Sequence, residues 1–207
     1  MVKFLGQFDK TMQSLLVPPS VSVSISTTHI RRSGPRGVRL RPLSPFIIQG
    51  RFTPEGRRLV VSLPEVGSSL TTTERARSIA TALSYLSQAL QGVAHGYRRR
   101  LRLVGVGFRS VDSKPGSTSS PLSLKIGYSH DVLVSRESRA AEGISLTPSR
   151  LEGRSKGTLL SLEGPDRSRL NHAAITIRTL REPDAYKGKG IHFDREKHVL
   201  KKGKRET

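Results

Sequence analysis

T-T-T-E-R-A-R-S-I-A-T-A-L-S-Y-L-S-Q-A-L-Q-G-V, residues 71 to 93, is the stretch that decides the fold. Its first four residues match a capping box, because the Thr71 hydroxyl can accept a backbone N–H three residues on while the Glu74 side chain reaches back. An apolar residue then recurs every three or four positions: Ile79, Leu83, Leu86, Leu90 and Val93. This spacing predicts a helix with one apolar side that packs on a sheet. Gly92 and Gly96 are expected to end it.

The residues before this helix have the pattern of an antiparallel sheet. Val21, Val23 and Ile25 alternate with serines, which is the period of a half-buried strand. Further short strands, separated by Pro and Gly, are predicted at residues 38–41, 46–48 and 59–63. Residues 1–16 have only a broken apolar pattern and match no clear targeting signal, so we expect a mobile N-terminal extension.

The chain after Gly96 repeats the order of strands followed by a helix. In R-R-R-L-R-L-V, residues 98–104, Leu101 and Leu103 point to one face of a strand, and Arg98 and Arg100 point to the other. The arginine face is either a binding surface or an ordinary solvated face, and the strand alone does not decide between the two.

The second unit ends in a second helix. Short strands are predicted at 122–126, 132–134, 144–146 and 158–162. Asp166 is a good N-cap residue, and the residues that follow it supply one apolar side: Leu170, Ala173, Ala174 and Ile177. The fold class is therefore α+β, with two similar small domains that each pack an antiparallel sheet against one main helix. We place their boundaries at 17–96 and 97–182, with a loop and basic tail at 183–207.

The charge of the chain predicts a polyanionic partner. Thirty-six Lys and Arg stand against 16 Asp and Glu, which gives a formal net charge of +20. Residues 1–96 carry a net +8 and residues 97–207 a net +12, so both halves are basic. Nucleic acid is favoured over a membrane surface, because Trp is absent and the charge is not confined to one amphipathic helix. No apolar run approaches the roughly 20 residues that a membrane span needs.

The common catalytic and metal-binding patterns are missing from the sequence. The absence of cysteine excludes disulfides and thiolate chemistry. Gly105-Val106-Gly107 lacks the third glycine and the helix start of a dinucleotide fingerprint, and no serine lies in G-x-S-x-G. The six histidines lack the spacing of metal ligands. We therefore expect no enzyme activity, no metal and no cofactor.

The segment R-E-P-D-A-Y-K-G-K-G-I-H-F-D-R-E-K-H-V-L-K-K-G-K, residues 181–204, is the candidate binding element. It lacks the apolar periodicity of an ordinary helix or strand, so we expect it to need an outside partner. Gly188 and Gly190 allow positive φ and a close approach to that partner, Lys187 and Lys189 offer ammonium groups, and Tyr186 offers a stacking face.

Four separated motifs of the second half carry a resemblance to a known family. They are G-V-A-H-G-Y-R-R-R-L-R-L-V-G-V-G-F-R (92–109), I-G-Y-S-H-D-V (126–132), A-A-I-T-I-R (173–178), and R-E-P-D-A-Y-K-G-K-G-I-H-F with the basic run after it (181–204). In order and spacing they resemble the bacterial-type ribosomal large-subunit protein six family, of which Y-K-G-K-G is close to a signature. The first half resembles the family more loosely.

The resemblance implies a non-catalytic protein of two similar sheet-and-helix domains that binds large-subunit rRNA. It places the protein near the sarcin-ricin region and the stalk base, beside other large-subunit ribosomal proteins and with translation factors nearby. The matching positions supply the rRNA-contact candidates Arg178, Arg181, Tyr186, Lys187, Gly188, Lys189, Gly190, Lys201, Lys202 and Lys204. Arg98 and Arg100 join them from the arginine face of the strand.

Departures from the family bear on the compartment and on the alternatives. Ser129-His130-Asp131 stands where S-H-P is common, and the N-terminal extension and the loops at 112–121 and 135–143 are atypical. The extension, these loops and the more loosely matching first half favour an organellar ribosome, in the mitochondrial matrix before the plastid stroma, with the bacterial cytoplasm as a further alternative. The rival functions are a free-standing RNA-binding protein or RNA chaperone, and a phosphate-handling enzyme that uses K-G-K-G as its anion loop.

Overall fold

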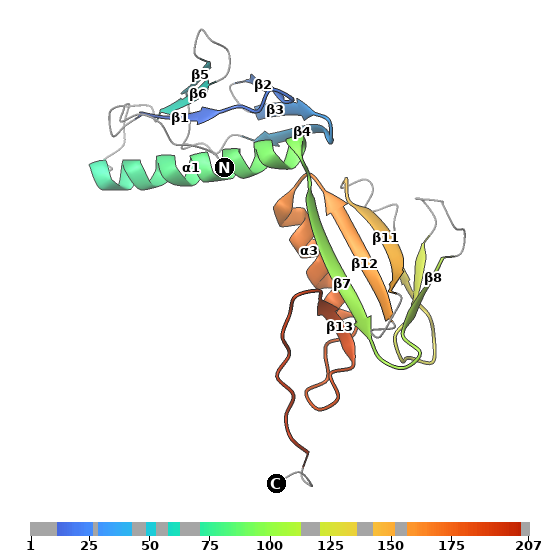
Figure 1. The fold of residues 1–207 in the computed structure, drawn as a ribbon. Coiled ribbons are helices and arrows are strands. Elements are labelled where there is room, and N and C mark those ends of the chain that lie inside the picture. The colour runs from blue at the N-terminus through green and yellow to red at the C-terminus, as the bar shows by residue number, and fades with distance from the viewer. Residues whose placement is uncertain are drawn as a thin grey trace. The chain divides into compact units, whose positions relative to one another are not determined.

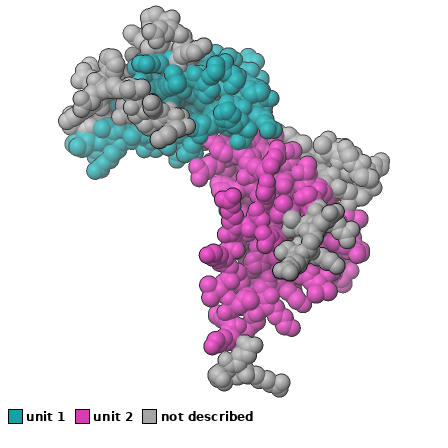
Figure 2. All heavy atoms as spheres, in the orientation of Figure 1, with its two compact units in different colours: residues 1–96 teal, residues 97–207 magenta. Residues whose placement is uncertain are grey.

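The computed structural model describes residues 12–26, 29–42, 49–52, 58–62, 71–112, 121–135, 143–151 and 157–203. The chain forms two compact units, residues 1–96 and 97–207, coloured separately in Figure 2. Within the described ranges, each unit contains antiparallel sheets and one long helix (Figure 1), so the predicted α+β class is confirmed. Among the described helices, none is both long and apolar enough to span a membrane.

The first unit packs two small sheets with one helix. Its elements are β1 (Met12–Leu16), β2 (Ser22–Ile25), β3 (His29–Gly34), β4 (Gly37–Pro42), β5 (Gln49–Phe52), β6 (Arg58–Ser62) and α1 (Thr72–Ala94). The strands form two antiparallel sheets with the orders β1-β6-β5 and β2-β3-β4. Helix α1 contacts β1, β3, β4 and β6, and Figure 1 shows it running alongside both sheets.

Helix α1 begins with the predicted capping box. The Thr71 hydroxyl accepts the Glu74 N–H at 3.4 Å, and a Glu74 carboxylate oxygen accepts the Thr71 N–H at 2.9 Å. Ile79, Leu83, Leu90 and Val93 are buried, and Leu86 packs at the edge of the same core. The amphipathic spacing therefore predicted the buried side of this helix correctly.

Strand β1 corrects the expectation for the N-terminal segment. Residues 12–16 belong to a sheet, because β1 pairs antiparallel with β6 in a register that places Leu15 opposite Leu59. Both leucines are buried. The strand is only five residues long and its partner lies more than 40 residues away, so no local pattern revealed it. Residues 1–11 and the strand predicted at 46–48 lie outside the described residues.

The second unit contains a four-stranded and a three-stranded antiparallel sheet. Its elements are β7 (Tyr97–Val104), β8 (Arg109–Asp112), β9 (Leu122–Lys125), β10 (Val132–Val134), β11 (Ser145–Leu151), β12 (Gly157–Gly164), α3 (Arg167–Thr179) and β13 (Gly190–Phe193). The sheet orders are β11-β12-β7-β13 and β10-β9-β8. Most of each loop predicted at 112–121 and 135–143 lies outside the described residues.

Helix α3 covers the apolar face of the larger sheet. The Asp166 carboxylate accepts the Ser168 and Arg169 N–H groups, which confirms it as the N-cap. The helix contacts β7, β12 and β13, as Figure 1 shows. The predicted apolar side of α3 is buried in one core with residues from both sheets: Leu101, Leu103, Leu122, Leu124, Leu160, Leu162, Leu170, Ala173, Ala174, Ile177 and Ile191.

Strand β13 corrects the expectation that residues 181–204 contain no ordinary strand. Residues 190–193, G-I-H-F, pair antiparallel with β7, and Ile191 lies opposite Leu103 with no exposed surface. The prediction was wrong because apolar and polar residues alternate over only three positions of G-I-H-F, which is too short a pattern to indicate a strand. It follows that the lysine-rich loop is held at both ends, by α3 before it and by β13 after it.

Candidate nucleic-acid interface

The Y-K-G-K-G loop is closed by hydrogen bonds that converge on Asp184. The Asp184 N–H donates to the Lys189 carbonyl at 2.9 Å, and the Asp184 carbonyl accepts the Gly188 N–H at 3.0 Å. Its carboxylate accepts the Lys187 N–H at 3.0 Å. The bond from the Lys187 amide is the main cause that lowers the pKa of Asp184 below its ordinary value of 3.8. The loop therefore has a defined shape without any partner.

The two glycines of the loop contact the protein itself. Gly190 has a φ of +151°, and a Cβ there would lie 2.7 Å from the Glu182 carbonyl oxygen and from the Pro183 Cα. Gly188 has a φ of +64°, and a Cβ there would lie 3.2 Å from a Leu200 methyl carbon. Both glycines are buried. The close approach that the sequence assigned to an outside partner is thus made within the chain.

The basic tail runs back beside the loop. The Lys201 N–H donates to the Ala185 carbonyl at 2.9 Å, and the imidazole Nε2 of His198 lies 3.2 Å from the Asp184 carbonyl oxygen. The buried His192 holds the other side through its Nε2, which lies 2.8 Å from the Gly188 carbonyl oxygen. Lys201 is therefore anchored against the loop although it follows β13.

The loop and the tail together present a cationic surface, which we call the lysine surface: Tyr186, Lys187, Lys189, Lys201 and Lys202. All five side chains are exposed, and Tyr186 is 60% exposed. No ion pair joins any of the four ammonium groups to a described carboxylate. Lys204, also a contact candidate, lies outside the described residues.

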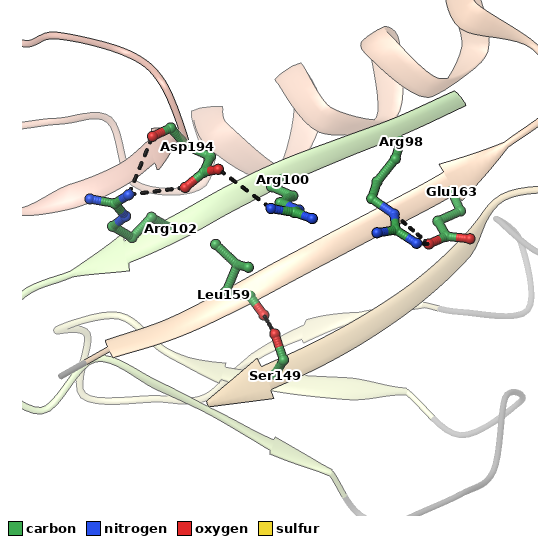
Figure 3. A network of polar contacts seen from close by, with 7 residues as sticks. All are labelled: Arg98, Arg100, Arg102, Ser149, Leu159, Glu163 and Asp194. Carbon is green, nitrogen blue, oxygen red and sulfur yellow. Dashed lines mark hydrogen bonds and ion pairs between the residues drawn. The ribbon is translucent and has the colours of Figure 1, made fainter. Parts of the chain in front are cut away.

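Three arginines of β7 differ from these lysines in having acidic partners (Figure 3). Arg98 Nε donates to the Glu163 carboxylate at 2.6 Å. Arg102 binds the Asp194 carboxylate at 2.9 Å, and Arg100 lies 4.0 Å from the same group. The predicted strand with an apolar face and an arginine face is confirmed. Much of the charge on that arginine face is compensated within the sheet.

Arg178 and Arg181 are also held by contacts within the chain. The Arg178 guanidinium binds the Glu196 carboxylate at 2.6 Å and lies over the Phe193 ring. The Arg181 guanidinium lies 4.9 Å from the centroid of the Tyr128 ring. The structure thus separates the predicted contact residues into a lysine surface and a set of arginines with internal partners.

Three residues that shape the loop were absent from the sequence-based candidates: Asp184, His192 and His198. Asp184 had a local signal, because an aspartate that accepts a backbone N–H a few residues later is a common turn former. The two histidines had none, since their partners are backbone carbonyls, Gly188 for His192 and Asp184 for His198, and no residue pattern marks such a contact.

Comparison with known proteins identifies the family. No family model matches the chain. It is 32% identical to the large ribosomal subunit protein uL6 of Lactobacillus delbrueckii subsp. bulgaricus over 91% of this chain and 93% of that protein. It is 33% identical to uL6 of Geobacillus stearothermophilus with the same coverage, and 31% identical to uL6 of an Azoarcus species over 92% and 95%. At this identity over nearly the full length of both chains, the protein belongs to the uL6 family of large ribosomal subunit proteins.

Proposed function

We propose that this protein is a structural constituent of the large ribosomal subunit that binds large-subunit rRNA through its second unit. Two lines support the proposal. The relatives are large ribosomal subunit proteins by name, and the lysine surface supplies exposed ammonium groups on a loop whose shape is already set. The second observation carries the proposal, because a preformed loop pays little ordering entropy when it binds.

The mechanism is electrostatic and depends on shape. Each phosphate that a lysine neutralises releases counterions, so the affinity falls with salt by a log-log slope of roughly 0.7 to 0.9 per phosphate. The paired arginines of β7 contribute less than the lysines, because RNA would have to displace Glu163 or Asp194 to use their full charge. The loop contacts the folded RNA backbone and does not read base sequence.

The proposed place of the protein in the particle rests on the family resemblance. We place it near the factor-binding side, beside the sarcin-ricin region and the stalk base, in contact with neighbouring ribosomal proteins and with translation factors nearby. Its role there is structural support of translation, and no catalytic residue is assigned.

The compartment remains a prediction that rests on the atypical extension, the atypical loops and the loosely matching first half. The relatives reported above are bacterial and agree with the bacterial cytoplasm. Fractionation of the source cells tests the mitochondrial assignment, which requires the protein to co-purify with mitochondrial ribosomes. Its recovery with plastid or cytoplasmic ribosomes overturns that assignment and leaves the ribosomal function in place.

A charge-reversal pair tests the binding surface. Lys187→Glu with Lys189→Glu removes two ammonium groups from the lysine surface, and we expect a large loss of affinity for in vitro transcribed large-subunit rRNA. The salt slope should fall by about 1.4 to 1.8, which is the share of two phosphates.

The matched control changes the charge equally at the other end of α3. The control variant, Arg167→Glu with Arg169→Glu, changes two residues in the first turn of α3, about 20 Å along the helix from its C-terminal end. Acidic residues there favour the helix dipole, so the fold should be kept. Equal losses for both variants would show that binding depends on diffuse charge and would refute a docking loop.

Sedimentation separates the ribosomal function from its rivals. The tagged protein should move with the large subunit in a gradient at physiological salt. If it stays in light fractions while large subunits assemble normally, the free-standing RNA-binding function is correct instead. Turnover of a nucleotide or phosphoester by the purified chain, abolished by Lys187→Ala, would support the enzyme rival.

A further inference from the structure

A second exposed feature lies next to the lysine surface. In the turn formed by residues 126–131, the rings of Tyr128 and His130 are stacked, with centroids 5.6 Å apart and an interplanar angle of 13°. The guanidinium of Arg181 lies over the same Tyr128 ring at 4.9 Å. A phenol, an imidazole and a guanidinium thus form one stack, which we call the Tyr128 stack.

The Tyr128 stack is held in place by the protein. The Tyr128 hydroxyl donates to the Leu180 carbonyl at 3.1 Å, which ties the turn to the end of α3. Gly127 has a φ of +83°, and a Cβ there would lie 3.1 Å from the Phe108 ring. The turn is therefore fixed on both sides, and the rings are ordered before any partner arrives.

The rings nevertheless remain accessible to solvent. Tyr128 is 44% exposed, and His130 is exposed as well. The nearby Asp131 carboxylate accepts the Ser123 hydroxyl at 2.9 Å and lies 3.8 Å from the Lys125 ammonium group. Its negative charge is therefore partnered, which lowers the repulsion of a polyanion at this turn.

The stack connects directly to the lysine surface through the backbone. The Arg181 carbonyl accepts the Ile191 N–H at 2.9 Å, and the next two residues, Glu182 and Pro183, form the wall against which Gly190 packs. Arg181 thus belongs to the stack through its side chain and to the base of the lysine loop through its backbone.

We infer that the Tyr128 stack is a docking point for an unpaired nucleobase of the same RNA, an inference that rests on the proposed function. Bases that leave an RNA helix stack on aromatic rings and on arginine guanidinium planes. The stack offers both groups in a set arrangement, with Tyr128 and His130 exposed and Arg181 half-buried, within a chain of net charge +20. Stacking tolerates any base, so the point selects unpaired over paired RNA and not one base over another.

Binding measurements on ring variants test the inference. Tyr128→Leu and His130→Ala should each weaken binding of in vitro transcribed large-subunit rRNA, by about 5-fold to 140-fold for the loss of a stacked base. The salt slope should stay unchanged, because no phosphate contact is lost. Tyr128→Phe should bind nearly as well as the parent chain, since it keeps the ring and loses only the bond to Leu180. Tyr85→Leu, on an exposed tyrosine of α1, is the matched control and should have no effect.

A tryptophan reporter tests base contact directly. The chain contains no Trp, so His130→Trp places a lone fluorophore in the stack. Large-subunit rRNA should quench its emission, whereas a perfectly paired RNA duplex should not, because its bases are not available. Equal quenching by both RNAs, or by neither, overturns the inference.

The two proposals fail separately. If Tyr128→Leu and His130→Ala bind rRNA like the parent chain while Lys187→Glu with Lys189→Glu does not, the stack is purely structural and the proposed function stands. If neither set changes binding, the proposed binding surface fails. If the Tyr128→Leu variant does not fold, the His130→Ala variant alone tests the inference, because the His130 side chain is exposed and its removal should not disturb the fold.

Discussion

Replacing Gly190 by alanine tests whether the lysine loop is shaped by packing within the chain. Its φ of +151° is in a region that only glycine adopts readily, so the alanine backbone costs about 1–3 kcal/mol. The new Cβ would also lie 2.7 Å from the Glu182 oxygen and the Pro183 Cα, and such overpacking costs about 1–3 kcal/mol. If the loop keeps its shape, the total is about 2–6 kcal/mol.

The chain can avoid part of this cost by releasing β13 from β7. Release exposes Ile191, which has no exposed surface in the folded chain, and costs about 1.5–3 kcal/mol in lost apolar burial. The strand pairing is lost as well, with a net cost of about 0.5–1.5 kcal/mol for each hydrogen bond. The variant will adopt whichever of the two states, the strained loop or the released β13, costs less free energy. We therefore expect Gly190→Ala to lower the free energy of unfolding by about 2–4 kcal/mol.

Urea unfolding followed by circular dichroism measures this change, and hydrogen exchange locates it. The amides of residues 184–193 should exchange faster, and rRNA affinity should fall although the net charge stays at +20. Gly203→Ala is the matched control, because a Cβ there meets nothing within 4 Å. Gly188→Ala should fall between them, since its Cβ meets the movable end of Leu200. If Gly190→Ala and Gly203→Ala agree within about 0.5 kcal/mol and exchange alike, the packing argument is refuted.

Three further predictions concern acidic residues around the lysine surface. Asp184→Ala raises the net charge from +20 to +21, yet it should weaken rRNA binding, because the Lys187 amide loses its acceptor and the loop loses its shape. Tighter binding would show that net charge alone determines the affinity. The pKa of Asp184 is lowered in the folded chain, so its support of the loop should be complete well above pH 3.8 and be lost as the pH falls through the lower folded pKa. In an acid titration by NMR, the chemical shift of the Lys187 amide should change with a midpoint below pH 3.8. A midpoint at or above pH 3.8 contradicts the bond between that amide and the Asp184 carboxylate. Asp194→Asn removes the carboxylate shared by Arg100 and Arg102, so the salt slope of RNA binding should become steeper by about 0.7 to 0.9 for each phosphate gained; an unchanged slope would mean that the ion pairs do not restrain these arginines.

Both helices were predictable because their signals are local. The capping box of α1 spans four residues, and the N-cap of α3 bonds to groups two and three residues on. Their apolar residues recur within one or two turns, and all of the predicted ones are buried except Leu86, which is partly buried. Since a helix makes its hydrogen bonds within itself, its sequence contains most of the information that positions it.

The short strands β1 and β13 were missed for the opposite reason. Each has four or five residues, and each depends on a partner far along the chain, β6 for β1 and β7 for β13. Neither strand has an alternation of apolar and polar residues as long as the one that indicated the equally short β2, and among the described side chains each buries a single apolar one, Leu15 or Ile191. Only the pairing makes each of them a strand.

By itself, the sequence determined the α+β class, the two helices with their buried sides, the basic character of the chain and the loop that carries the exposed lysines. The tertiary structure alone decided which charges have partners. Glu163 and Asp194 reach the arginines of β7 from 65 and 92 residues away, so alternation within one strand could not show that they are paired. It also decided why the loop contains glycine, because in the closed loop Gly190 faces the backbone of Glu182 and Pro183. Charge and periodicity can be read from neighbouring residues. Ion pairs and close packing, in contrast, exist only between segments that folding brings together.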